Sequence, residues 1–241
     1  MTSQKPVDGQ SLPGLLQRTL GVIWSPRPTF EAVMATPKWL GMLALTIAVP
    51  ALITGAFMST DVGQQALVAQ QQAAMAEFGI TLSDEQFAQI SQTTNYSALL
   101  QAGALVVTIP IVTLVLSGLL FVVANAFLAA RVKFVQVFAV VVHVGVIGIV
   151  QQLFQIPLNY ARGALSSPST LAAFVPMLEP ATFTVRFLSA VDLFIVWQVV
   201  LLAIGLSVFA TRRSGPIAVV CLLLYAAIAT GIAVVRGLLT N

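Results

Sequence analysis

The most regular feature of the chain is a series of long apolar runs, separated by segments that carry most of the charges. A membrane-spanning helix needs about 20 predominantly apolar residues. Five runs reach that length, so the pattern predicts an all-α, polytopic membrane protein built as a bundle of about five transmembrane helices. The runs are residues 39–57, a stretch within 98–130, and residues 134–156, 187–210 and 216–235.

The segment before the first run, residues 1–38, has a different pattern. Apolar residues recur at helical spacing over residues 11–24, with a few polar residues among them. This spacing predicts an amphipathic helix at the membrane interface. Pro26 and Pro28 end it, and a second short helix is expected over residues 29–35. Two interpretations stay open: an element that binds a partner or senses lipids, or a helix that packs on the membrane face of its own bundle.

Residues 59–97 form the longest connection between the apolar runs. They contain no Lys or Arg, and a stretch rich in Gln and Ala, residues 64–77, precedes Gly79. Ser83 followed by Gln86 has the pattern of a capping box. We therefore expect a helical loop in which two helices meet at Gly79.

Composition supports a membrane location. The chain of 241 residues is 58% hydrophobic and 8% charged, with a mean hydropathy of +0.96. Soluble domains carry about 25% charged residues, so the lipid bilayer is the partner that this surface fits. The net charge is +3, but the basic residues are spread among the connections, so no nucleic-acid partner is expected. The single cysteine, Cys221, allows no disulfide within the chain.

The distribution of Lys and Arg predicts the orientation, because cytoplasmic connections carry an excess of basic residues. We expect the protein in the cell (inner) membrane, with the N-terminus in the cytoplasm and the C-terminus and the 59–97 loop on the extracytoplasmic side. Eight basic residues lie on the predicted cytoplasmic side, namely Lys5, Arg18, Arg27, Lys38, Arg131, Lys133, Arg212 and Arg213, against Arg162, Arg186 and Arg236 on the other.

Motifs of catalytic chemistry are missing from the sequence. The chain has one histidine, which excludes a histidine-rich metal site and leaves no Ser-His-Asp set that spacing supports. No P-loop and no G-x-S-x-G motif occurs. We expect no enzymatic activity, no cofactor and no metal.

Polar residues inside the predicted spans are the candidates for function, because such residues are costly in lipid. His143 lies near the middle of the third span, and Gln136, Gln151 and Gln155 extend a polar stripe along the same helix. The stripe fits a water-filled or proton-conducting path, and it fits equally a set of hydrogen bonds between helices. Asn125, near the end of the second span, is expected to form such an interhelical bond.

Asp192 is the acidic residue within the predicted spans. Arg186 precedes it along the chain, and Arg236 ends the fifth span at the same expected depth. An ion pair of Asp192 with either arginine would pin the ends of two helices together. The alternative is a substrate or ion site at the outer mouth of the bundle.

Two short stretches resemble the Yip1 family. The first is WSPRPTF before the first span, which contains Pro26 and Arg27. The second is VDLFIVW in the fourth span, which contains Asp192 and Trp197 and is followed by Gly205 and a leucine. The resemblance implies a bacterial-type, multi-pass protein with five spans and a cytoplasmic N-terminus.

The resemblance implies more about fold than about function. It makes Asp192 and Trp197 expected family features that serve packing. Eukaryotic members take part in vesicle trafficking and bind small GTPases of the Rab class, but the short N-terminal segment here does not favour that role. Bacterial members, as a family, have no settled activity.

Two functions are therefore expected to compete. The first is a non-enzymatic membrane protein that organises or assists membrane partners or lipids. Its expected binding partner is another membrane protein or a second copy of the chain. The second is a small transporter or permease subunit that uses the intramembrane polar residues. A continuous hydrated cavity that reaches His143 and Asp192 would favour transport, and a dry, closed bundle would oppose it.

Overall fold

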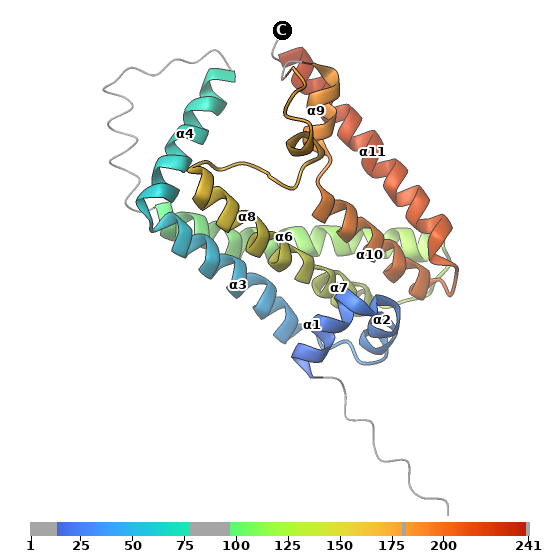
Figure 1. The fold of residues 1–241 in the computed structure, drawn as a ribbon. Coiled ribbons are helices and arrows are strands. Elements are labelled where there is room, and N and C mark those ends of the chain that lie inside the picture. Colours follow the sequence, from blue (N-terminus) through green and yellow to red (C-terminus); the bar gives the residue numbers. More distant parts are fainter. Residues whose placement is uncertain (1–13, 78–96, 180–181, 240–241) are drawn as a thin grey trace, which may run out of the picture.

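The computed structural model describes residues 14–77, 97–179 and 182–239, and this part of the chain is helical (Figure 1). The expected second helix of the 59–97 loop lies outside the described residues. The α-helices are α1 (Leu15–Trp24), α2 (Pro26–Ala35), α3 (Leu40–Met58), α4 (Asp61–Glu77), α6 (Ser97–Val122), α7 (Phe134–Val144), α8 (Val146–Arg162), α9 (Phe183–Ala190), α10 (Leu193–Phe209) and α11 (Ser214–Leu239). A π-helical turn, η2 (Val123–Phe127), ends α6, and a short 3₁₀ helix, η3 (Leu171–Phe174), precedes α9.

The helices form a polytopic membrane bundle. Four candidate spans among the described residues are long and apolar enough to cross a bilayer: α3, α6 with η2, α7 with α8, and α11. The fourth expected run, residues 187–210, is divided, because α9 ends at Ala190 and a new helix, α10, begins after Asp192. With 17 residues, α10 is about 26 Å long, which is slightly less than the hydrocarbon thickness of about 30 Å.

The third expected run is also divided, at Gly145 between α7 and α8. A Cβ atom at this position would lie 3.3 Å from Thr46 Cγ2 and 3.0 Å from the carbonyl oxygen of Val142. The glycine therefore lets α3 approach the junction closely. The backbone of Gly145 is itself right-handed helical, and α7 with α8 forms one candidate span.

Helices α1 and α2 are packed into the bundle. Val22, Phe30 and Val33 are almost fully buried, in one apolar cluster with residues of α7 and α10. Pro26 is the first residue of α2, a position where its missing N–H costs no hydrogen bond. This packing is the one that the second interpretation of the N-terminal segment predicts.

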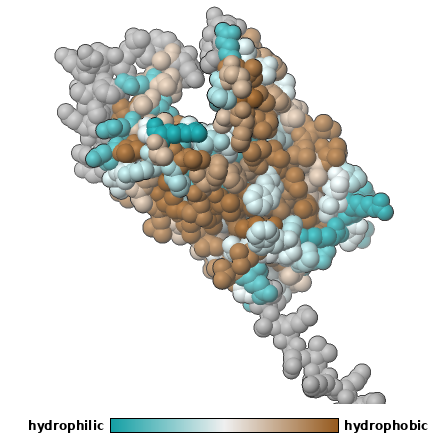
Figure 2. All heavy atoms as spheres, in the orientation of Figure 1, coloured by the Kyte–Doolittle hydropathy of each residue, from teal (hydrophilic) through white to brown (hydrophobic). Residues whose placement is uncertain are grey.

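The outward surface of the bundle is apolar. Brown, hydrophobic residues cover most of its middle in Figure 2, and the hydrophilic residues gather toward the two ends. Helices α6 and α11 supply much of this surface, since only 6% and 11% of their most apolar segments are buried. Such long apolar faces are suited to lipid contact. Figure 2 also shows the surface hollowed between α4 and the pair formed by α9 and α11.

Candidate functional site

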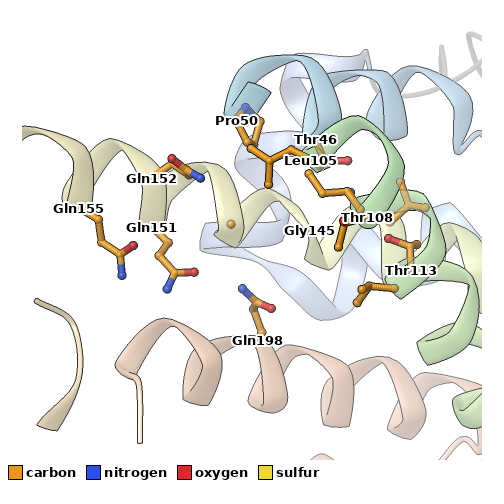
Figure 3. A pocket seen from close by; sticks show the side chains of 14 residues that line it. Thr46, Pro50, Leu105, Thr108, Thr113, Gly145, Gln151, Gln152, Gln155 and Gln198 are labelled. Atoms are coloured by element: carbon orange, nitrogen blue, oxygen red, sulfur yellow. The ribbon is translucent and has the colours of Figure 1, made fainter. Parts of the chain in front are cut away.

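A cavity of about 350 Å³ lies within the bundle, lined by residues of α3, α6, α8 and α10 (Figure 3). Four glutamine side chains line it, Gln151, Gln152 and Gln155 from α8 and Gln198 from α10, together with threonines of α3 and α6. In Figure 3, Gln151 and Gln198 extend toward one another from α8 and α10. Four amides at the depth of a membrane span are costly unless they have partners, so this site is the candidate for function.

A second cavity of about 240 Å³ continues the first toward α4. The two share Leu105, Gln152 and Gln155 in their linings. The second is lined further by Gln70 of α4, by Asn159 and by other residues at the ends of α3 and α8. We call the two cavities together the glutamine groove. It runs from the middle of the bundle to the end where α4 lies.

The opposite end of the glutamine groove is closed. Its lining reaches Thr46 on α3 and Val142 on α7, and includes no residue of α1 or α2. Val142 belongs to a buried apolar cluster with Met42, Phe138 and Val146. The groove is therefore polar and open on the side of α4 and blocked by packed side chains on the side of α1 and α2.

The groove also reaches the lipid-facing surface along α6. Thr108 and Val112 line the cavity and are nevertheless exposed, Val112 by 55% of its surface. Helix α6 packs mainly against α3 and α7, whereas α10 packs mainly against α11 and α2. The space between α6 and α10 is therefore open beside these two residues.

Hydrogen bonds orient three of the glutamines. Gln151 Nε2 donates to Asp192 Oδ2 at 3.3 Å, and Gln155 Nε2 donates to the Ser169 hydroxyl at 2.8 Å. The Thr54 hydroxyl donates to Gln152 Oε1 at 3.4 Å. Among the described residues, the Gln198 amide has no hydrogen-bond partner.

Asp192 caps the N-terminus of α10. Its Oδ1 accepts from the N–H groups of Phe194 at 2.8 Å and Ile195 at 3.3 Å. Its Oδ2 accepts from Gln151 and from the Ser169 hydroxyl. Asp192 as a residue is 6% exposed, so these four donors compensate for the water that the carboxylate loses on burial.

Asp192 does not form the expected ion pair with Arg186 or Arg236. In the described part of the chain, the salt bridge is between Arg27 and Glu31, at 3.3 Å, and the partners of Asp192 are amides and a hydroxyl. The helical conformation is interrupted before α10, and the first N–H groups of the new helix donate hydrogen bonds to the carboxylate. Spacing along the sequence suggested a nearby cation but could not show this break.

The aromatic neighbour of Asp192 ties α9, α10 and α11 together. The Tyr225 hydroxyl accepts from the backbone N–H of Asp192 at 3.1 Å and donates to the carbonyl oxygen of Ala190 at 3.0 Å. Leu193 N–H donates to the carbonyl oxygen of Ser169 at 3.0 Å, which holds the loop before η3 against the same junction. The junction between α9 and α10 is therefore held in place by hydrogen bonds to α11 and to the loop before η3.

His143 lies apart from the glutamine groove. It is fully buried and lines neither cavity. Its Nδ1 donates to the carbonyl oxygen of Ala139 at 2.6 Å in the same helix, and its Nε2 has no partner among the described residues. Gln136 is also outside the groove, since its amide donates to the carbonyl oxygen of Met34 at 3.1 Å and so fastens α7 to α2. Of the predicted stripe, Gln151 and Gln155 alone face the cavity.

Asn125 does not form the expected bond between helices. Its Nδ2 donates to the carbonyl oxygens of Phe121 at 3.0 Å and Val132 at 3.3 Å, and its Oδ1 accepts from the Val132 N–H at 3.0 Å. The side chain thus joins the π-helical turn to the connection that follows it. The amide thereby supplies hydrogen-bond partners to the Phe121 carbonyl in α6 and to the backbone N–H and carbonyl of Val132 in the connection.

We predict that Asn125→Leu destabilises the protein by about 3 kcal/mol, because it removes three hydrogen bonds of about 1 kcal/mol each and leaves backbone groups unpaired. Thermal unfolding in detergent measures the change. Asn125→Asp is the matched control, since it keeps the bond from Val132 N–H and loses those to the two carbonyls. An unfolding temperature of Asn125→Leu equal to that of the parent would contradict the structural role.

The residues of the Yip1-like stretches have structural partners. Arg27 pairs with Glu31 and donates from Nη1 to the Ser207 hydroxyl of α10 at 3.5 Å. Trp197 is partly buried against the central apolar cluster. Arg27 therefore connects α2 with α10, and Trp197 has the packing position that the resemblance implies for it.

The sequence did not single out four residues of this site. Gln198 and Tyr225 stand in apolar runs as isolated polar side chains, and this isolation was their only signal. The signal for Gln152 was its place next to Gln151, and Ser169, in a connection among other serines, had no signal. Within the described residues, no three His, Cys, Asp or Glu side chains are grouped to hold a metal ion.

Comparison with known families gives one match, the Yip1 domain, over residues 20–235. Comparison with curated proteins and with solved structures gives no match. The matched range includes α2, three of the candidate spans, most of the fourth and the residues that line the glutamine groove. The chain therefore belongs to the Yip1 domain family of multi-pass membrane proteins.

Proposed function

We propose that this chain is a non-enzymatic membrane protein that organises or assists lipids or membrane partners, and that it engages lipid in the glutamine groove. The observation that carries the proposal is the shape of the groove. It holds glutamine and threonine side chains among apolar ones, is closed by apolar packing near Val142, and is open to the hydrocarbon beside Thr108 and Val112. A lipid can place its headgroup in such a groove while its chains stay in the bilayer.

The orientation that we propose follows the basic residues, with the N-terminus in the cytoplasm. The open end of the groove, beside α4, then belongs to the extracytoplasmic half of the membrane. A lipid of that leaflet would reach the groove with its headgroup toward α4 and its chains toward the middle of the bilayer.

The proposal predicts that Thr108→Trp, which fills the opening beside α6, lowers the amount of lipid retained by the purified protein about tenfold, since the indole occupies the path of the headgroup. Native mass spectrometry after detergent exchange measures the retained lipid. Leu114→Trp is the matched control, because Leu114 is exposed on the same helix and does not line the groove. Equal loss from both variants, or no retained lipid in the parent protein, would refute the proposal.

A small transporter is the second candidate. One observation favours it: the buried Asp192 carboxylate is a single hydrogen bond away from the cavity, through Gln151. A titratable group in this position could accept a proton from a cargo or couple its movement. The closed end at Val142 and the separation of His143 from the groove oppose this function.

Proton flux distinguishes the two candidates. In liposomes that contain a pH-sensitive dye and an imposed pH gradient, a proton-coupled transporter would dissipate the gradient faster than empty liposomes, and Asp192→Asn would abolish the difference. The lipid-binding proposal predicts that neither the parent protein nor Asp192→Asn changes the rate.

A further inference from the structure

We propose that the glutamine groove selects lipids with an uncharged, hydroxyl-bearing headgroup, such as diacylglycerol or a glycosylated diacylglycerol. This inference rests on the proposed function and names its ligand class. The observations that carry it are the missing charge in the groove, the direction of its hydrogen-bonding groups, and the apolar face of α6 beside its opening.

The lining of the groove carries no formal charge. Among the described residues, neither cavity is lined by Lys, Arg, Asp or Glu. The charged group that is bonded to the lining is the Asp192 carboxylate, through Gln151, and it repels anions. Phosphate headgroups are bound in proteins by arginine, lysine or helix N-termini, and the N–H groups of α10 are already occupied by Asp192. A phosphate in this groove would remain unpaired in a low-dielectric site.

The fixed amides need a ligand that both donates and accepts hydrogen bonds. Gln151 and Gln155 each use an N–H within the protein, and their carbonyl oxygens remain without a donor among the described residues. For Gln152 the reverse holds, since its side-chain carbonyl accepts from Thr54 and its side-chain N–H groups have no acceptor among the described residues. A hydroxyl group satisfies both kinds of partner, whereas an ester, an ether or an ionised phosphate oxygen only accepts.

The size and the flank of the groove fit a lipid. A cavity of about 350 Å³ is at the lower end of the small-molecule range of about 300–1,000 Å³, which suits a small headgroup. From the opening, Val112, Val115 and Leu119 continue along one exposed face of α6. This face leads away from α4, so acyl chains that lie on it would contact α6 while the headgroup stays among the glutamines.

A matched pair of lipids tests the selection. The parent protein is incubated in detergent micelles with equal amounts of diacylglycerol, monoglucosyl-diacylglycerol and phosphatidic acid of the same acyl chains, and the bound lipid is measured by native mass spectrometry. Diacylglycerol and phosphatidic acid differ only in the phosphate. We expect either uncharged lipid to be retained about tenfold more than phosphatidic acid, because the phosphate lacks a cationic partner.

Gln198→Leu is the test within the protein. The Gln198 amide has no hydrogen bond to lose among the described residues, so the variant is expected to fold normally, and it should lower retention of the uncharged lipids about tenfold. Gln71→Leu is the control, since Gln71 is exposed on α4 and lines neither cavity. Unchanged retention in Gln198→Leu, at an unchanged unfolding temperature, would overturn the inference.

The other outcomes separate this inference from the proposed function. Retention of phosphatidic acid equal to that of diacylglycerol, still abolished by Thr108→Trp, would overturn the selection and leave a lipid-binding groove. Retention of no lipid in any case would overturn the proposed function itself. Displacement of bound diacylglycerol by free glucose or glycerol at millimolar concentration would show that the groove binds a dissolved polyol, and would overturn the assignment to lipid.

Discussion

Asp192→Ala is expected to lower the free energy of unfolding by about 4 kcal/mol, which corresponds to a fall of about 10 °C in the unfolding temperature. The substitution removes the cap of α10 and leaves the Ser169 hydroxyl, the Gln151 amide and two backbone N–H groups without their acceptor. Cys221 is the single thiol of the chain and packs against the core, so a thiol-reactive fluorescent dye reports the unfolding directly.

Asp192→Asn is the control that separates capping from charge. Its carbonyl oxygen can still accept from the N–H groups of α10, and asparagine caps helices about as well as aspartate. We expect a loss of about 1 kcal/mol, much less than for alanine. An equal loss for both variants would mean that the negative charge itself stabilises the site, as the ion pair expected from the sequence requires.

The positions of the spans could be predicted because they depend on local composition. Runs of about 20 apolar residues need no tertiary partner to be recognised, and all five contain a helix of the bundle. The break at Asp192 could not be predicted from such runs. An aspartate in an apolar stretch can pair with a cation or cap a new helix, and only the conformation of residues 191–192 decides between them.

The glutamine groove could be predicted only in part. Helical spacing placed Gln136, His143 and Gln151 in one stripe, but of these three only Gln151 lines the cavity, whereas Gln136 bonds to α2 and His143 is buried among apolar side chains. Gln198 belongs to another helix, and its meeting with Gln151 depends on the packing of α8 against α10. Contacts between distant segments of this kind leave no periodic signal within a single sequence.

The amphipathic pattern of residues 11–24 predicted that a helix forms there, but it did not predict which of its side chains face the bundle and which face outward. Leu16, Leu20 and Trp24 are exposed, whereas Arg18 is partly buried and donates to the carbonyl oxygen of Lys38 at 2.8 Å. A helix that turns apolar side chains outward and a cation inward is suited to lipid on its outer side. The exposed apolar face is therefore compatible with a helix that belongs to the membrane bundle.

Phe30→Ala in α2 is expected to destabilise the whole bundle by about 4 kcal/mol and to lower the unfolding temperature by about 10 °C. The ring is fully buried in the central cluster. Beside it α7 and α10 are tightly packed, since a Cβ atom at Gly205 would lie only 2.8 Å from Val140, so no nearby side chain can easily fill the space that alanine leaves.

Trp24→Ala is the matched aromatic control for this second prediction, because the Trp24 side chain is 81% exposed at the end of α1. We expect its unfolding temperature to stay within about 2 °C of that of the parent protein. A fall for Trp24→Ala and none for Phe30→Ala would contradict the packing of α2 in the core.

If the prediction holds, a deletion of α1 and α2 unfolds the protein and cannot test partner binding, because the deletion also removes Val22, Phe30 and Val33 from the core. Surface substitutions such as Leu16→Ser and Trp24→Ala then provide the valid test of whether this segment binds lipids or a partner.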